Sequence, residues 1–245
     1  MKAQNLNQMT PYVFMAPAAI IMGLALLYPL TYMIYGSFRA WDRSKNISET
    51  EFVGLKNYIT LFFDPAFRES LSVTLMFAFA VVTAELAIGV GLALLLDRNI
   101  RGMSVLRTLF ILPMMIAPVV VGLMWRYMYH PMVGTINKTL KSMGFESVDW
   151  LGQHALLSVI IADIWQWTPF IFILSLAALQ SLPRSALEAA KIDGATGWQQ
   201  IRYIKLPLMM PVLIVTGLLR LIDAFKVLEV ILVMPEGGPG LSTEI

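Results

Sequence analysis

The segment ADIWQWTPF, residues 162–170, holds the polar and aromatic side chains best suited to binding a ligand. Asp163, Trp165 and Trp167 lie within five positions of one another in a mostly apolar stretch. A carboxylate can accept hydrogen bonds from hydroxyl groups, while indole faces cover the C–H surfaces of a sugar ring. We take these three residues as first candidates for contact with a hydroxylated solute. The alternative is that the tryptophans only pack between helices.

A second group of ionisable residues follows later in the chain. Arg220, Asp223, Lys226 and Glu229 recur every third position with alternating sign. On a helix this spacing lets them pair and offset the cost of burial, which is the simpler interpretation. If the same face lines a polar path, Asp223 and Lys226 are second candidates for contact with solute.

Three acidic residues inside apolar segments leave two other function classes open. Glu85, Asp163 and Asp223 could relay protons or bind sodium in an ion-coupled secondary transporter. Asp163 and Asp223 could also form the dyad of an intramembrane aspartyl protease, but no paired-aspartate motif accompanies them. The sequence also lacks H-E-x-x-H and G-x-S-x-G motifs. We expect no catalytic residue, and no enzyme.

Cofactor chemistry has equally little support in the sequence. There is no cysteine, which excludes disulfides and thiolate metal sites. No G-x-x-x-x-G-K-[ST] loop is present to bind nucleotide phosphates. The formal net charge of +2 gives no reason to expect a nucleic-acid partner. We predict no cofactor-binding or metal-binding residue in this chain.

The composition places all these residues in a lipid bilayer. The chain is 58% hydrophobic and only 14% charged, with a mean hydropathy of +0.70, far from a soluble domain. Crossing a bilayer core of about 30 Å takes about 20 apolar residues in a helix. Five stretches qualify, and they predict an all-α transmembrane bundle forming one domain over residues 1–245: Tyr12–Ser37, Ser72–Leu96, Leu106–Tyr129, Ala155–Gln180 and Leu208–Met234. Kinks are expected at Pro113, Pro118 and Pro169.

The insert LEAAKIDGATGWQQIRYIKLP, residues 187–207, is a polar and charged segment between two long apolar runs. Ser185 to Glu188 fits a capping box, and so does Thr196 to Gln199. Gly194 lies between them and can adopt a positive φ without steric cost. The pattern predicts two short helices joined by a sharp turn. An amphipathic loop on the lipid surface is the alternative.

Part of this insert resembles the EAA loop in membrane subunits of binding-protein-dependent ABC importers. The resemblance rests on E-A-A at 188–190, on Gly194 and on I-x-L-P at 204–207. It extends to the carbohydrate type of permease, similar to the maltose and glycerol-3-phosphate importers. The stretches that carry it are MAPAAIIMGLALLYPLTYMIYGSF near the N-terminus, FVGLKNYITLFFDPAF at 52–67, ILPMMIAPVVVGLMW at 111–125 and GGPG at 237–240.

The resemblance implies a type I ABC importer permease fold, with a cytoplasmic EAA coupling loop at 182–207 that docks on an ATPase. The docking residues carried over from the motif are Glu188, Ala189, Ala190, Asp193, Gly194, Ile204, Leu206 and Pro207. Expected partners are a second permease subunit in a heterodimer, two cytoplasmic ATPase subunits that bind ATP and magnesium, an extracytoplasmic solute-binding protein and the lipid bilayer. The cargo would be a sugar or related polyol.

Orientation depends on the same resemblance. Lys and Arg divide evenly between the two sides of the predicted bundle, so the positive-inside rule does not decide. Placing the EAA loop inside the cell puts the N-terminus of an inner-membrane protein in the cytoplasm. Permeases of this type have a further span after the GGPG loop, whereas five are seen before Ile245. A sixth span is therefore expected to be missing.

Overall fold

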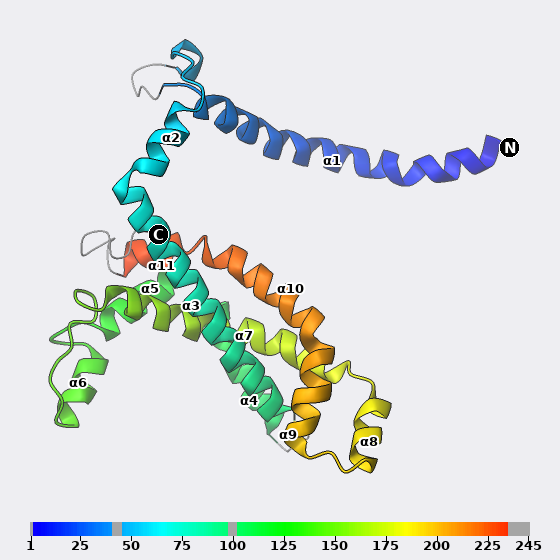
Figure 1. Ribbon diagram of the computed structural model, residues 1–245, viewed down its shortest axis with the longest axis vertical. Coiled ribbons are helices and arrows are strands. Elements are labelled where there is room, and N and C mark those ends of the chain that lie inside the picture. Colours follow the sequence, from blue (N-terminus) through cyan, green and yellow to red (C-terminus); the bar gives the residue numbers. More distant parts are fainter. Residues whose placement is uncertain (1, 41–45, 98–101, 235–245) are drawn as a thin grey trace. The chain divides into compact units, whose positions relative to one another are not determined.

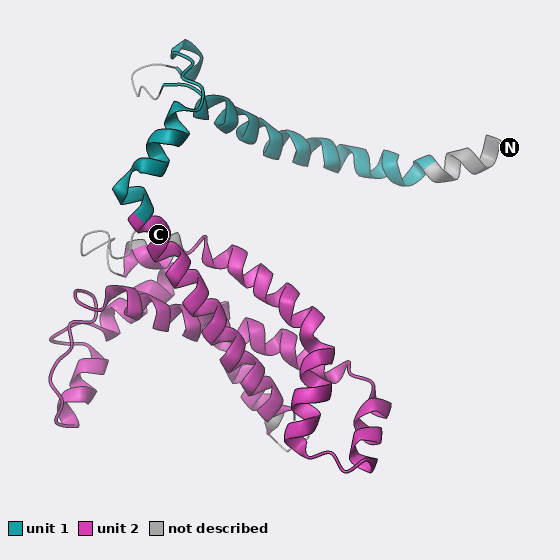
Figure 2. Cartoon of the chain, viewed as in Figure 1, with its two compact units in different colours: residues 1–68 teal, residues 69–245 magenta. Residues whose placement is uncertain are grey.

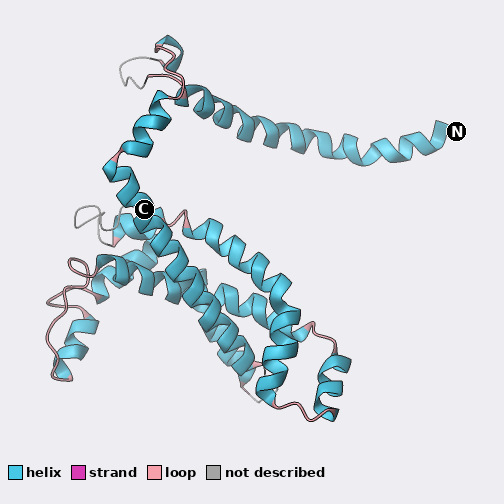
Figure 3. Cartoon of the chain, in the orientation of Figure 1, coloured by secondary structure: helices cyan, strands magenta, loops and turns pink. Residues whose placement is uncertain are grey.

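The computed structural model describes residues 2–40, 46–97 and 102–234 (Figure 1). These residues are mostly helical, and the part described contains no β-strand beyond an isolated bridge between Arg39 and Phe52 (Figure 3). The chain divides into two compact units, residues 1–68 and 69–245 (Figure 2). The GGPG segment lies outside the described residues.

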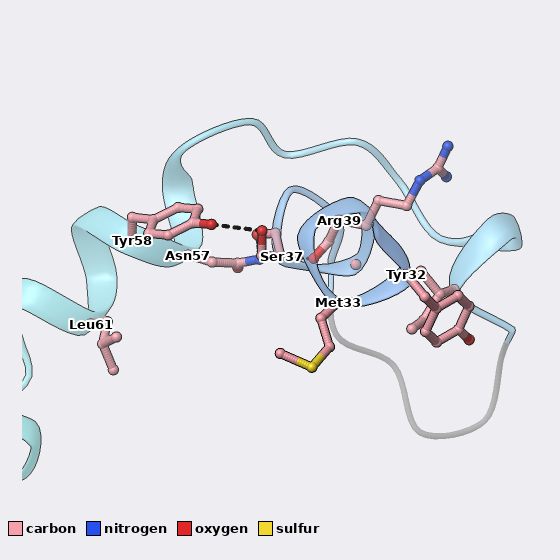
Figure 4. Close-up of a pocket in the computed structure, with 9 residues that line it drawn as sticks. Tyr32, Met33, Ser37, Arg39, Asn57, Tyr58 and Leu61 are labelled. Carbon is pink, nitrogen blue, oxygen red and sulfur yellow. Dashed lines mark hydrogen bonds between the residues drawn. The ribbon is translucent and has the colours of Figure 1, made fainter. Parts of the chain in front are cut away.

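Unit 1 consists of a long apolar helix and a short helix fastened to its end. Its elements are α1 (Lys2–Ser37), the 3-10 turn η1 (Ile47–Glu49) and α2 (Lys56–Phe63). The Asn57 side-chain amide donates to the carbonyls of Ser37 and Arg39, at 2.9 and 2.8 Å. The hydroxyls of Ser37 and Tyr58 are 2.7 Å apart (Figure 4). The two Asn57 bonds use backbone acceptors at and just after the end of α1, where a helix leaves its last carbonyls without helical partners.

Unit 2 contains the remaining helices. They are α3 (Pro65–Leu96, beginning just before the unit), α4 (Met103–Ile111), η2 (Leu112–Met115), α5 (Pro118–Met128), α6 (Thr135–Ser142), α7 (Ala155–Gln180), α8 (Arg184–Ile192), α9 (Gly197–Gln200), the π-turn η3 (Ile201–Lys205), α10 (Leu206–Ala224) and α11 (Leu228–Val233). The described helices confirm the predicted all-α fold class.

Among the described residues, four helical segments are long and apolar enough to cross a membrane. They are Met9–Ser37, Pro65–Leu96, Ala155–Gln180 and Gly197–Ala224. The predicted span Leu106–Tyr129 is not one helix: Ser104–Met115 and Pro118–Met128 meet at 95°. This pair is either a fifth, broken span or a re-entrant loop.

Two prolines explain the break in that segment. Ile116 and Ala117 are extended, with ψ of 134° and 136°. Pro118 disfavours the helical conformation at Ala117, and Pro113 supplies no amide donor. The predicted kinks at Pro113 and Pro118 therefore appear as one sharp bend. Pro169, by contrast, lies inside α7, which continues to Gln180.

The last predicted span, Leu208–Met234, is also displaced. Its helix ends at Ala224, and a turn at residues 225–227 separates it from α11. The Lys226 amide donates to the Asp223 carbonyl at 2.9 Å, which closes that turn. At the other end the candidate span begins at Gly197, because α9, η3 and α10 follow one another without a break. The predicted second loop helix is thus the start of the span.

The core of unit 2 is formed by α3, α5, α7, α10 and α11. Gly89 of α3 permits the close approach of α7, since a Cβ there would lie 2.7 Å from Ile171 Cβ. One apolar cluster surrounds Phe77, Val81 and Val159, and another surrounds Phe172 and Met209. Glu85, Asp163 and Arg220 are buried, and along their helices they lie between the residues of these two clusters.

Candidate functional site: a buried ion cluster, a polar cavity and a capped loop

Three ionisable residues from three helices meet in the interior of unit 2. Arg220 of α10 places Nε 2.7 Å from Glu85 Oε2 and donates from Nη2 to Glu85 Oε1 at 3.0 Å. The same Nη2 contacts the Oδ2 oxygen of Asp163 on α7. The side chains of Glu85 and Asp163 are fully buried, and that of Arg220 is 1% exposed. One guanidinium therefore ties two carboxylates from α3 and α7 to α10.

Burial explains why this cluster forms. A charge within the bilayer costs about 2.5–3.5 kcal/mol on insertion scales, so unlike charges on neighbouring helices lower each other's cost. The planar guanidinium suits this role because it can hold Nε and Nη2 close to Glu85 and still reach Asp163. Asp163 Oδ1 is buried without a hydrogen-bond partner among the described residues. Among these residues, Asp163 is therefore held through Oδ2 alone, by Arg220.

Beside the cluster lies a cavity of about 370 Å³. It contains four of the five predicted solute contacts, namely Asp163, Trp167, Asp223 and Lys226, and its other lining residues are Pro118, Arg220, Val227 and Val230. The Arg220 guanidinium carbon lies 5.4 Å from the centre of the Trp167 ring, within cation–π range. The cavity offers one indole face and groups of both charges.

Ion pairs continue along α10 from the cluster to the cavity wall. Asp223 Oδ2 is 3.7 Å from Arg220 Nη1, and Asp223 Oδ1 is 3.9 Å from Lys226 Nζ. Exposure rises in the same direction, from 1% at Arg220 to 41% at Asp223 and 68% at Lys226. The predicted pairing along one helix face is present for Arg220 and Asp223, whereas Lys226 pairs with Asp223 from the turn that follows α10. The side chain of Glu229 lies outside the described residues.

Trp165, the fifth candidate, faces elsewhere. Its ring packs edge-on against Trp125 at 5.9 Å and lines a separate, mainly apolar pocket with Phe110 and Pro113. Residues four apart share a helix face, as Asp163 and Trp167 do, whereas residues two apart do not. Contact between Trp165 and the solute stays a prediction, although Trp165 lines a different pocket from the other four candidates.

Sequence reasoning missed the pairing of Glu85 with Arg220, which are 135 positions apart. A usable signal was present, because an acidic residue within one span and an arginine within another need partners of opposite sign. The role of Gln166 was also missed. It is buried, and its amide donates to the Ile116 carbonyl at 3.1 Å, which fastens α7 to the broken segment.

The polar insert is a folded helix–turn–helix element. The first capping box is wrong: α8 begins at Arg184 with Pro183 as its N-cap, so Ser185 already lies inside the helix and makes no cap bond. Gly194 has φ +78° and ends α8 as predicted. The Gly194 amide donates to Lys191, and the Ala195 amide to Ala190, at 3.1 and 2.9 Å, the pairing of a Schellman motif.

The second capping box is confirmed. The Thr196 amide donates to Gln199 Oε1 at 2.7 Å, and the Gln199 amide donates to Thr196 Oγ1 at 3.3 Å. Among the predicted docking residues, Ala190 is buried and Ile204 and Leu206 are half-buried, while the others are exposed: Glu188, Ala189, Asp193, Gly194 and Pro207. Ile192 was not predicted, yet it is 86% exposed.

Across the described chain, no group of three or more His, Cys, Asp or Glu residues is arranged to hold a metal ion. Apolar helices able to cross a bilayer, a polar cavity inside the helical bundle and a folded polar loop between two spans define a membrane transport subunit. More specifically, residues 85–243 match the inner membrane component of binding-protein-dependent transport systems, and the chain belongs to this family.

Relatives cover most of the chain. It is 40% identical over 228 residues to a probable ABC transporter permease of Sinorhizobium fredii, covering 93% of this chain and 74% of that protein. It is 40% identical over 199 residues to the trehalose/maltose transport system permease MalF of Thermococcus litoralis, covering 80% and 68%. The trehalose transport system permease SugA of Mycobacterium tuberculosis is 33% identical, covering 93% and 73%. The chain is therefore an ABC transporter permease.

A solved structure has the same fold. The crystal structure of a bacterial ABC transporter involved in the import of the acidic polysaccharide alginate contains a chain with a TM-score of 0.82 and 24% identity. The match covers 98% of this chain and 82% of that chain. A second structure of the alginate transporter, in complex with an alginate pentasaccharide-bound periplasmic protein, has a TM-score of 0.81. The fold is that of an ABC importer permease.

Proposed function

We propose that this permease carries a neutral sugar or a related polyol and forms half of an ATP-driven translocation path. The observation that carries this proposal is its 40% identity to a permease named for trehalose and maltose. The cavity is consistent with that cargo. Trp167 offers an aromatic face, while Asp223 and Lys226 are exposed enough to exchange hydrogen bonds with hydroxyl groups.

The charge of the cavity favours a neutral solute. Arg220 is already engaged by Glu85 and Asp163, and Lys226 by Asp223. An anionic solute would have to compete with these carboxylates for either cation. A polyhydroxylated solute needs no such exchange, because each of its hydroxyl groups can both donate and accept.

The capped loop is proposed to be the coupling element. Glu188, Ala189 and Asp193 are exposed on the loop, and Gly194 holds the turn between α8 and α9. In the proposed assembly this loop docks in the cytoplasm on an ATPase subunit, which binds ATP and magnesium. Two such ATPase subunits, a second permease and an extracytoplasmic solute-binding protein complete the importer. The N-terminus then lies in the cytoplasm.

The continuous helix from the loop to the cavity suggests how the loop and the cavity communicate. Leu206 and Arg220 are both on α10, and at 1.5 Å per residue they lie about 21 Å apart along its axis. A displacement of the loop is therefore transmitted through backbone hydrogen bonds to the residues that line the cavity. In an alternating-access cycle this motion would expose the cavity to either side in turn. The chain itself makes no covalent change to the solute.

The test is uptake by the assembled transporter in liposomes. The permease pair, its ATPase and its binding protein would be co-purified, reconstituted and supplied with labelled trehalose, maltose or glycerol 3-phosphate. We expect ATP-dependent uptake of a neutral sugar that survives collapse of the proton and sodium gradients. Uptake that does not require ATP, and that is lost when the proton or sodium gradient is collapsed, would establish the ion-coupled alternative instead.

A matched pair of variants tests the cavity. Trp167→Ala removes the aromatic wall and should raise the solute concentration needed for half-maximal uptake, whereas Trp165→Ala changes a different pocket. Equal effects on uptake from both variants would contradict the assignment of this cavity.

A further inference from the structure

A second large hollow of unit 2 is apolar and lies on the face of the bundle formed by α3, α9, η3 and α10. Its volume is about 710 Å³. On α3 it extends from Phe79 to Leu94, and on the other side from Trp198 to Leu221. This hollow, called the α3–α10 groove below, shares no lining residue with the polar cavity.

The dimensions of the groove suit a long, thin, apolar ligand. From Phe79 to Leu94 the groove runs about 22 Å along α3 at 1.5 Å per residue, and one leaflet of the bilayer core is about 15 Å deep. Two glycines in its lining leave space in the groove that a side chain would occupy. A Cβ on Gly91 would meet nothing within 4 Å, and one on Gly217 would meet only Leu86 Cδ1, at 3.4 Å. A hydrocarbon chain can therefore lie along the groove.

One end of the groove differs from the rest in its charge. Trp198 lines that end and is 67% exposed, as expected of an indole at the lipid headgroups. Arg202 is exposed on the same turn, and Lys205 lies next to the lining residue Leu206. Lys205 Nζ is 3.8 Å from Asp97 Oδ2, a long and partly exposed pair. Arg202 and Lys205 bring two positive charges to this turn, and Asp97 pairs with one of them.

We propose that the α3–α10 groove binds one anionic phospholipid. Its acyl chain would lie between α3 and α10, and its phosphate would contact Arg202 and Lys205 beside Trp198. Charge complementarity at this end distinguishes an anionic phospholipid from a protein helix, whose apolar surface would not use the two cations. The proposal rests on the proposed orientation only for the identity of the leaflet, which would be the cytoplasmic one.

The site has a consequence for coupling. The phospholipid would contact η3 and α10 where the capped loop joins the span, so it would hold the joint that transmits motion from the loop. Removing the lipid should leave the cavity residues unchanged and lower the ATP-dependent rate.

Photo-crosslinking in the reconstituted transporter tests the proposal directly. Phosphatidylglycerol with a photoreactive acyl chain would be added to phosphatidylcholine liposomes, and adducts would be mapped by mass spectrometry. We expect adducts concentrated in residues 79–94 and 206–221. Unlabelled phosphatidylglycerol should compete at least about tenfold better than phosphatidylcholine.

Two helical glycines provide matched variants. Gly91→Leu places a side chain in the groove, and Gly23→Leu adds the same side chain to α1; at both positions a Cβ meets nothing within 4 Å. Adducts should fall at least about fivefold in Gly91→Leu and stay unchanged in Gly23→Leu. In the double variant Arg202→Gln and Lys205→Gln, adducts should persist while the preference for phosphatidylglycerol disappears.

Three outcomes would overturn the proposal. Adducts spread evenly over α1 and α3 would indicate ordinary boundary lipid. Crosslinks from residues 79–94 to another protein chain would show that a protein helix fills the groove. Equal competition by both lipids would remove the role of the two cations. Crosslinking needs neither ATP nor solute, so its result is separate from that of the uptake experiment.

Discussion

Replacing Arg220 by methionine is the sharpest test of the buried ion cluster. Methionine keeps a long unbranched side chain but removes the guanidinium, so Glu85 and Asp163 lose their shared partner. Both carboxylates are fully buried while the guanidinium is in place. The variant thus leaves two acidic groups close together in the interior with no cation between them.

The expected cost is large for a single substitution. Removing one partner of a buried ion pair typically costs about 3–5 kcal/mol, because the remaining charge stays desolvated. Since about 1.4 kcal/mol corresponds to a factor of ten, the unfolding equilibrium should shift by about two to three and a half orders of magnitude. The triple variant Arg220→Met, Glu85→Gln and Asp163→Asn removes all three charges and should recover most of this loss.

Reversible unfolding of the complex in mixed detergent micelles would measure these free energies. Arg68→Met is the matched control, because Arg68 is exposed, and its variant should change the free energy of unfolding by less than about 0.5 kcal/mol. A loss below about 1 kcal/mol in Arg220→Met would refute the reasoning. So would a triple variant less stable than Arg220→Met alone.

The remaining predictions concern the loop and the helix contacts. Gly194→Pro should abolish ATP-dependent uptake, since proline cannot adopt φ +78° and lacks the amide hydrogen that bonds the Lys191 carbonyl. Gly194→Asn should retain uptake, because asparagine tolerates positive φ. Thr196→Ala should cost about 1 kcal/mol in unfolding free energy through the lost cap, and no loss would contradict the capping box. Gly89→Ala should destabilise by about 1–3 kcal/mol by crowding Ile171, whereas Gly91→Ala should be nearly neutral in the same measurement.

Hydropathy predicts the membrane spans well but places their ends poorly. Apolar composition continues across residues 116–117, so only the geometry imposed by Pro118 reveals the sharp break there. Apolar composition likewise continues past Ala224, although the helix ends at this residue. In both places the local backbone conformation sets where the helix ends, and average hydropathy does not report it.

The loop shows the same limit on a smaller scale. Thr196 and Gln199 form the predicted capping box because nothing precedes them that already begins a helix. Ser185 has the same sequence pattern, but Pro183 starts α8 two residues earlier. A capping motif therefore predicts a helix start only where the preceding residues do not supply another one.

For the candidate site, the sequence predicts contacts between residues of one helix better than contacts between residues of different helices. Asp163 and Trp167 share a face of α7 by the i, i+4 rule, and Arg220 and Asp223 pair on α10 by the i, i+3 rule. The pairing of Glu85 with Arg220 depends on how α3 and α10 are packed, which no local pattern encodes. Their opposite charges in separate spans were the one available indication.

The distance along the chain between Glu85 and Arg220 has a consequence for biosynthesis. Glu85 is made 135 residues before Arg220, which at about 5–20 residues per second is a delay of about 7–27 s. Asp163 is made 57 residues before Arg220. Glu85 is therefore without its cation for the whole interval, and Asp163 for the last 57 residues of it. Helices α3 and α7 must therefore stay beside the insertion machinery, or in contact with water, until α10 is synthesised.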